Sequence, residues 1–179
     1  MPNLLGLMQS SAYTLSAQTI FPSITLPAHA SMLSGLCPSQ HGVLWNEYVP
    51  ENGYALGVNL FDVAHASGLR TVMIVGKEKL RQVAEPASTD VFVYEETGEV
   101  AIANAAGKEI AQGFGVMFVH FPRGDLMGHE FGWMSKKQLE AYALGDTELW
   151  ELLAALDAKR LRSTTLIIVT SDHGGHKKT

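Results

Sequence analysis

The sequence predicts an α/β domain with a mostly parallel central sheet flanked by helices. Helical patterns alternate with short, continuous apolar runs at 71–75 (TVMIV), 116–121 (VMFVHF) and 164–170 (TTLIIVT). Runs of this kind are typical of strands that are covered on both faces. A helical pattern that ends in a glycine, as at Gly68, and is followed by such a strand indicates an α/β arrangement. In such a sheet we expect a functional site at the carboxyl ends of the strands.

Composition and charge fit one domain with a sizeable core. The 179 residues are 46% hydrophobic and 17% charged, and we expect residues 1–179 to form a single domain that is partial at both ends. A net charge of −5 and the lack of a strongly basic stretch exclude a cationic nucleic-acid-binding face. The sequence shows no membrane-spanning run and no signal peptide, so it leaves the compartment open. The single Cys37 excludes an internal disulfide and is expected to be a small buried residue.

The first elements lead into the segment 19–46, which carries the densest pattern of turn residues. Residues 2–12 are predicted to form a short helix that buries Leu4, Leu5 and Met8 on one face. Within 19–46, residues 21–24 are predicted to be extended, because a residue that precedes proline is pushed out of the α region.

A helix is predicted to follow these extended residues. Pro27 suits the first turn of a helix, and Gly35 suits a position just past a helix end. The helix between them therefore starts at or beside Thr25.

The rest of the chain alternates helices and strands. A helix at 60–67 is expected to bury Leu60, Val63 and Ala64 on one side. The elements predicted after it are a strand at 71–75, a short charged helix at 78–83, a strand at 90–94, a helix at 100–112, a strand at 116–121, a helix at 138–161 and a strand at 164–170.

Thr25 is the first candidate for chemistry. At or beside the N-cap, its hydroxyl lies near unpaired backbone N–H groups and the positive end of a helix dipole. This environment suits an oxygen that attacks a phosphate. The simpler interpretation is an ordinary threonine cap, which is a common role for this residue.

Two further clusters follow predicted strands. Asp125 and His129 lie four residues apart around a glycine-rich turn after 116–121, and Asp172 and His173 follow 164–170 directly. Carboxylate and imidazole donors suit zinc, manganese or iron, and two such ions can clamp a phosphoryl group. Each cluster also has a simpler interpretation. The first reads as a helix-start aspartate with an exposed histidine, and the second as a loop that closes a strand.

Three segments carry these residues in a fixed order: FPSITLPAHASMLSGLCPSQHGV (21–43), DLMGHEFG (125–132) and SDHGG (171–175). The combination resembles the alkaline phosphatase superfamily, specifically its nucleotide pyrophosphatase/phosphodiesterase (type I phosphodiesterase) branch. The three segments resemble that family's nucleophile segment, its second-metal motif and its first-metal motif, respectively. The resemblance implies an alkaline-phosphatase-like core and two divalent metal ions, expected to be zinc, with manganese or iron as alternatives.

The resemblance also assigns roles to these residues. It implies that Thr25 is the nucleophile, forms a phospho-threonine intermediate and is itself a metal ligand. Asp172 and His173 would be ligands of the metal that activates Thr25. Asp125 and His129 would be ligands of the other metal, which would activate the hydrolytic water.

Asn46 and three departures complete the comparison with the family pattern. Asn46 falls where the family places an asparagine that hydrogen-bonds a phosphate oxygen, although a turn residue is the simpler interpretation. The family's Pro-Asn-His is Pro27-Ala28-His29 here. The family's first metal-binding aspartate has no counterpart before Pro2, and its last metal-binding histidine has none at the end. Each metal is therefore expected to lack one protein ligand, for which His176 is a possible substitute and a loop histidine the alternative.

The resemblance implies metal-dependent hydrolysis of a phosphodiester or pyrophosphate bond in a small phosphate ester or nucleotide. Phosphomonoesterase and phosphomutase chemistry stay open. A sulfatase is disfavoured, because its formylglycine needs Cys or Ser where Thr25 stands. A hypothesis of a different class is a non-catalytic fragment or a degenerate phosphate-binding domain. The leaving group, the native metal and the oligomeric state are not predicted.

Overall fold

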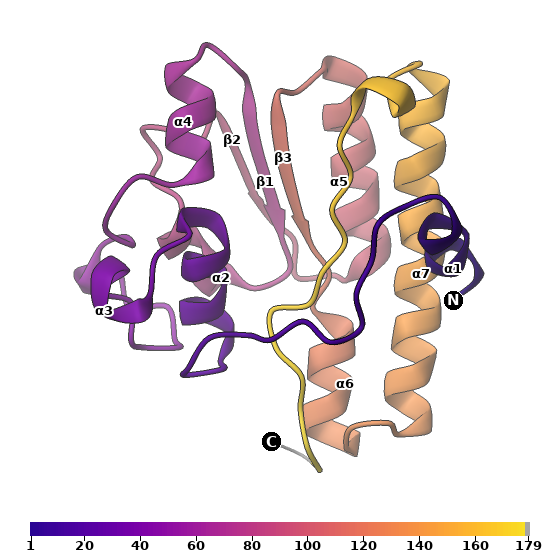
Figure 1. Ribbon diagram of the computed structural model, residues 1–179, viewed down its shortest axis with the longest axis horizontal. Helices are drawn as coiled ribbons and strands as arrows, with labels where there is room; N and C mark the ends of the chain where they lie inside the picture. Colours follow the sequence, from indigo (N-terminus) through magenta and orange to yellow (C-terminus); the bar gives the residue numbers. More distant parts are fainter. Residues whose placement is uncertain (178–179) are drawn as a thin grey trace.

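The computed structural model describes residues 1–177 and confirms the α/β class. Within this range the sheet has three parallel strands, β1 (Thr71–Val75), β2 (Val91–Tyr94) and β3 (Val116–His120), in the order β2-β1-β3. The register aligns Val75 at the end of β1 with Tyr94 and His120 at the ends of its neighbours. All three strands therefore present their carboxyl ends at one edge of the sheet, where Figure 1 shows α6 (Arg123–Phe131) and the start of α2 (Thr25–Ser34).

Two apolar clusters cover the two faces of the sheet. Met73 and Val75 of β1 pack with α2 and with Phe61 of α4 (Leu60–Ala66). Val72 and Ile74 point to the opposite face and pack with α5 (Glu99–Gln112), with Leu152 of α7 (Lys136–Ala158) beside them. This alternation follows from the two-residue period of a strand. Because every residue of β1 is buried, this strand is an apolar run without a polar face, as the sequence predicts.

The helix α2 begins and ends as predicted, whereas residues 21 and 22 form a bend instead of the predicted extended run. The preceding residue Ile24 is extended and forms the N-cap, so that Thr25 is the first helical residue. Gly35 ends the helix in the left-handed conformation with φ of 71°, which costs a glycine little. The short helix α3 (Pro38–His41) follows, and then a loop that contains the 3₁₀ turn η1 (Pro50–Asn52).

The helices α1 (Pro2–Gln9) and α4 are present, but their buried faces differ from the prediction. In α1 no residue is fully buried and Leu5 is exposed, because the helix is held by polar contacts from the backbone of Asn3 and Leu4 to the Asp146 carboxylate. In α4 the capping box of Asn59 fixes the helix start. That start turns Phe61 and Ala64, rather than Leu60 and Val63, into the core.

Most of the remaining elements match the prediction within three residues. They are the 3₁₀ helix η2 (Glu78–Val83) and the helices α5 and α7, to which the structure adds α6 and the 3₁₀ turn η3 (Arg162–Thr164). Cys37 is exposed rather than buried, since it caps the short surface helix α3. None of the helices among residues 1–177 is both long and apolar enough to cross a lipid bilayer.

The predicted strand at 164–170 is wrong. Thr164 belongs to η3, residues 165–170 run as coil toward the C-terminus (Figure 1), and Leu166 is 86% exposed. In the part of the chain that the structure describes, no backbone hydrogen bond joins residues 166–170 to β3. An apolar run alone does not make a strand, because a strand requires a neighbour that completes its hydrogen bonds. Residues 171–173 nevertheless reach the carboxyl edge of the sheet.

The close approach of Gly76 to α6 yields a test of this packing. A Cβ at Gly76 would lie 2.3 Å from Pro122 Cγ, so Gly76→Ala is expected to lower the free energy of unfolding by roughly 1–3 kcal/mol through overpacking. The matched control is Gly107→Ala in α5, where a Cβ meets nothing within 4 Å and alanine favours the helix. Urea unfolding of both variants checks this, and an unchanged midpoint for Gly76→Ala would contradict the packing.

Candidate active site

The candidate site lies where the carboxyl edge of the sheet meets the start of α2. Thr25 is 3% exposed and stands in the first turn of α2. It borders a cavity of about 490 Å³. The residues that line the cavity come from the start of α2, the loop after α3, α6 and the C-terminal segment: Ser23, Ile24, Thr25, Asn46, His129, His173, Gly174, Gly175 and His176.

Asn46 is oriented by the start of α2. Its Oδ1 accepts a hydrogen bond of 3.0 Å from the backbone N–H of Leu26, one of the amides that a helix start leaves unpaired. Because the carbonyl side of the amide is used in this way, the Nδ2 group remains as a donor at the cavity that Asn46 lines. Asn46 therefore ties the loop after α3 to the start of α2 at the edge of the cavity.

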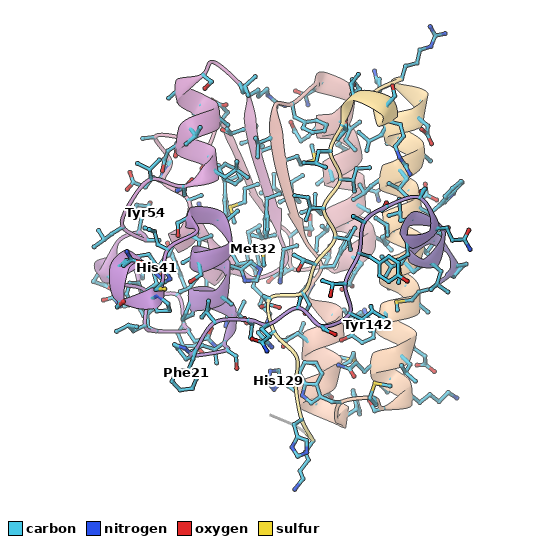
Figure 2. The ribbon with its side chains drawn as sticks, in the orientation of Figure 1. Phe21, Met32, His41, Tyr54, His129 and Tyr142 are labelled. Atoms are coloured by element: carbon cyan, nitrogen blue, oxygen red, sulfur yellow. The ribbon has the colours of Figure 1, made fainter. Side chains whose placement is uncertain are left out.

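Asp125 and His129 meet on α6. Four residues apart on one helix, their side chains share a face, and His129 Nε2 lies 3.3 Å from Asp125 Oδ1. His173 Nε2 approaches the same oxygen at 3.7 Å from the C-terminal segment. Figure 2 shows His129 beside that segment at the end of α6. The two clusters that lie far apart in the sequence are thus neighbours.

Asp172 and His173 are held by contacts to three other parts of the chain. Thr19 Oγ1 donates to the Asp172 carbonyl at 2.5 Å, and Trp133 N–H donates to the Lys177 carbonyl at 2.7 Å. Asp172 Oδ2 lies 3.4 Å from His173 Nε2 and 3.5 Å from His29 Nδ1. Trp133 packs against this segment rather than lining the cavity, since its ring stands edge-on to those of His129 and His173.

The structure adds two lysines that the sequence analysis missed. Lys77 Nζ donates to Thr25 Oγ1 at 3.3 Å and to Asp125 Oδ2 at 2.5 Å, and Lys79 Nζ donates to the Asn46 carbonyl at 2.8 Å. Both follow β1 directly, at the edge where an α/β sheet places its site. That rule, applied to the polar residues after 71–75, would have identified them.

Two further histidines, the buried His29 and the partly buried His120, were also missed as members of the site. His29 Nδ1 lies 2.7 Å from the Thr25 carbonyl, and its ring meets that of His120 edge-on at 5.2 Å. Both positions look like ordinary core residues in the sequence, one within a helix and one within an apolar strand. His41, in contrast, bonds Ser31 and the backbone of Val43, and therefore has a structural role.

Burial and neighbouring charges together shift the pKa values of several of these groups. Burial alone would raise the pKa of Asp125, but the hydrogen bond and charge of Lys77 outweigh it and hold that pKa below its ordinary value. Burial lowers the pKa of His120 well below its usual range, with a further contribution from the neighbouring His29. Burial, followed by the charge of Lys77, also lowers the pKa of Lys79. The site therefore favours a charged Asp125 and a neutral His120.

Carboxylate and imidazole groups of the kind that bind a divalent metal ion are present at the site. They occur as two pairs, Asp125 with His129 and Asp172 with His173. Asp125 Oδ1 is buried and has no hydrogen-bond partner among the described residues, yet it faces two imidazole nitrogens. Ligands of a tetrahedral zinc ion with bonds of 2.0–2.1 Å lie roughly 3.4 Å apart, close to the spacing of the Asp125–His129 and Asp172–His173 pairs. Within residues 1–177, no three His, Cys, Asp or Glu side chains are grouped so as to hold one ion.

A family model described as type I phosphodiesterase / nucleotide pyrophosphatase matches residues 1–93 and 75–177. The chain belongs to this family. The resemblance to the nucleotide pyrophosphatase/phosphodiesterase branch of the alkaline phosphatase superfamily is thereby confirmed.

Relatives of this phosphodiesterase family agree with that assignment. An uncharacterized pyrophosphatase/phosphodiesterase of Schizosaccharomyces pombe is 25% identical over 198 residues, which cover 97% of this chain and 40% of the relative. A structure of murine ectonucleotide pyrophosphatase/phosphodiesterase 5, an inactive threonine-to-alanine variant in complex with AMP, superposes with a TM-score of 0.71 at 16% identity. It covers 90% of this chain and 48% of the murine chain.

The human ectonucleotide pyrophosphatase/phosphodiesterase 5 superposes with a TM-score of 0.54 at 17% identity, over 80% of this chain and 43% of the human one. These likenesses show that the chain shares the fold of the phosphodiesterase family. The chain spans less than half the length of the relatives it matches.

Two adjacent glycines test how the C-terminal segment reaches the site. A Cβ at Gly175 would lie 1.7 Å from Trp133 Cε2, whereas a Cβ at Gly174 meets nothing within 4 Å. Gly175→Ala is therefore expected to displace His173 from the site, and Gly174→Ala is expected to leave it in place. The chemical shifts of the His173 ring in NMR spectra check this. Equal spectra for both alanine variants would contradict the contact with Trp133.

Acid titration tests the burial of His120. Because its pKa is lowered on folding, the unfolded chain binds more protons below about pH 6.5, so stability falls as the pH decreases from there. His120 is expected to contribute at most about 1.4 kcal/mol per pH unit to this loss. His120→Phe should flatten the profile of urea unfolding between pH 5 and 6.5 relative to the wild type. Parallel profiles for wild type and His120→Phe would refute the assignment.

Proposed function

We propose that this chain forms the catalytic core of a metal-dependent hydrolase of phosphodiester or pyrophosphate bonds. The observation that carries the proposal is the convergence of Thr25, Lys77 and Asp125 beside a cavity that His129 and His173 line. Family membership supports hydrolysis of this class of bond. The AMP that the murine relative binds supports a nucleotide or another small phosphate ester as substrate.

Thr25 is the proposed nucleophile. Its Oγ1 attacks the phosphorus, a Thr25–phosphate ester bond forms, and the bond to the leaving oxygen breaks. The proton of the hydroxyl passes to solvent, and the leaving oxygen takes up a proton. A water molecule then attacks the phospho-threonine, which releases the phosphate product and restores the hydroxyl. The inactive threonine-to-alanine variant of the murine relative supports a threonine in this role.

The surrounding side chains bind and orient the phosphate. The Nδ2 group of Asn46 donates to a phosphoryl oxygen, while its Oδ1 keeps the start of α2 in place. The positive end of α2 and the Lys77 ammonium stabilise negative charge at the attacking oxygen.

Divalent ions, expected to be two and expected to be zinc, would be held by Asp125 and His129 and by Asp172, His173 and Thr25. Bound there, they would supply Lewis-acid polarisation of the phosphoryl oxygens.

A second candidate is a phosphate-binding domain without turnover. The observation that favours it is the arrangement of the metal donors in pairs, since no group of three occurs within residues 1–177. Phosphomonoester hydrolysis by the same residues is a variant of the first proposal, and the choice of substrate in the assay separates the two.

Substitution of Thr25 tests the proposal. With zinc or manganese present, Thr25→Ala is expected to abolish hydrolysis of bis(p-nitrophenyl) phosphate, because removing the nucleophile removes the covalent step. Thr25→Ser is expected to retain part of the rate. Thr147→Ala, on the exposed surface of α7, is the matched control and should behave as wild type.

Mass spectrometry of the denatured, rapidly quenched enzyme should detect phosphate on the peptide that contains Thr25. Turnover by Thr25→Ala at the wild-type rate would exclude the mechanism. A wild-type chain that turns over neither a diester nor p-nitrophenyl phosphate, and yet binds inorganic phosphate, would favour the second candidate.

A further inference from the structure

The turn after β1 brings one ammonium group to the nucleophile and a second one to Asn46. β1 ends at Val75, and Lys77 is still extended as the N-cap of η2. Lys79 lies in the first turn of that 3₁₀ helix. Both side chains therefore leave the sheet at its carboxyl edge. Neither residue belongs to the motifs that relate the chain to its family, and the mechanism above uses only the charge of Lys77.

Lys77 connects the nucleophile to the acidic side of the site. Its Nζ lies 3.3 Å from Thr25 Oγ1 and 2.5 Å from Asp125 Oδ2, and its side chain is 14% exposed. Because Lys77 holds Oδ2, the other oxygen of Asp125 remains turned toward His129 and His173. An ammonium has three N–H donors. With two partners among the described residues, it keeps one N–H for a substrate oxygen next to Thr25.

Lys79 approaches the site from the side of Asn46. Its Nζ donates to the Asn46 carbonyl at 2.8 Å and has no carboxylate partner among the described residues. Burial and the neighbouring charge of Lys77 both disfavour the charged form of Lys79. A bound anion would relieve this, since a positive charge that lacks a partner gains most from a negative ligand.

We propose that Lys77 and Lys79 form an anion-binding pair that selects substrates with a second negative charge beside the attacked phosphate. Lys77 is a catalytic residue that contacts the nucleophile and binds an oxygen of the phosphate under attack. Lys79 binds the neighbouring anionic group, such as the second phosphate of a nucleoside diphosphate. The preferred bond is therefore a pyrophosphate rather than a diester with a single charge. The selection of substrate rests on the proposed function, whereas the binding of an anion does not.

Binding of inorganic phosphate tests the pair without turnover. Isothermal titration calorimetry in the presence of EDTA removes any contribution from metal ions. Lys77→Met and Lys79→Met are each expected to weaken phosphate binding about tenfold or more, as expected for the loss of a hydrogen bond to a charged group. The control Lys108→Met, on the exposed face of α5, removes the same charge and should leave the affinity unchanged.

A second comparison covers the chance that Lys77→Met does not fold, because it leaves Asp125 without its partner. In that case Asp125→Asn is compared with the double variant Lys77→Met and Asp125→Asn. The double variant is expected to bind phosphate about tenfold more weakly than Asp125→Asn. Two results would overturn the pair. One is a wild-type chain that does not bind phosphate. The other is a wild-type phosphate affinity in Lys79→Met together with equal affinities in Asp125→Asn and the double variant.

Kinetics separate the pair from the proposed hydrolase. Lys79→Met is expected to lower kcat/KM for a nucleoside diphosphate about tenfold more than it lowers kcat/KM for bis(p-nitrophenyl) phosphate. Lys77→Met lowers both. An equal loss on both substrates in Lys79→Met would overturn the role of Lys79 in substrate selection. Lysine-dependent phosphate binding without turnover of either substrate would support the anion site and contradict the hydrolase.

Discussion

The contact between Lys77 and Asp125 is the interaction on which the rest of the site depends. Lys77 comes from the turn after β1 and Asp125 from α6, and the same ammonium reaches Thr25 at the start of α2. One cation thus joins three elements that are distant in the sequence. Because separating this largely buried ion pair would leave an uncompensated charge, the pair holds α6 at a fixed distance from the sheet. It also fixes the direction in which Asp125 Oδ1 points.

The two apolar clusters make this contact possible. They cover both faces of the sheet, so that β1 ends buried and its next polar residue emerges between α2 and α6. Gly76 allows the ring of Pro122 to approach closely, and this approach brings the start of α6 to the end of β1. Glu99 accepts from the backbone N–H of Arg123 and holds the same helix start from the side of α5. The site is therefore a consequence of helix packing at one edge of the sheet.

The C-terminal segment is attached to this frame mainly through polar contacts. Thr19 bonds the Asp172 carbonyl, and Trp133 packs against Gly175 and bonds the Lys177 carbonyl. The preceding apolar residues 166–170 are without strand neighbours among the residues described and contribute little to the core. His173 nevertheless comes within 3.7 Å of Asp125. The family's fold is thus recognisable in a chain that spans less than half of its relatives.

The sequence by itself determined the α/β class, the position of Thr25 at a helix start and the two Asp–His clusters. These depend on local rules, namely the conformation before proline, the glycine after a helix end and the length of apolar runs, and such rules act within a few residues. Only the tertiary structure decided that 164–170 is not a strand, because pairing requires a neighbour that no local pattern specifies. Only the fold, likewise, brought Lys77 to Thr25 and Asp125, since 48 residues separate Lys77 from Asp125 in the chain. A lysine after a strand looks like surface until packing encloses it.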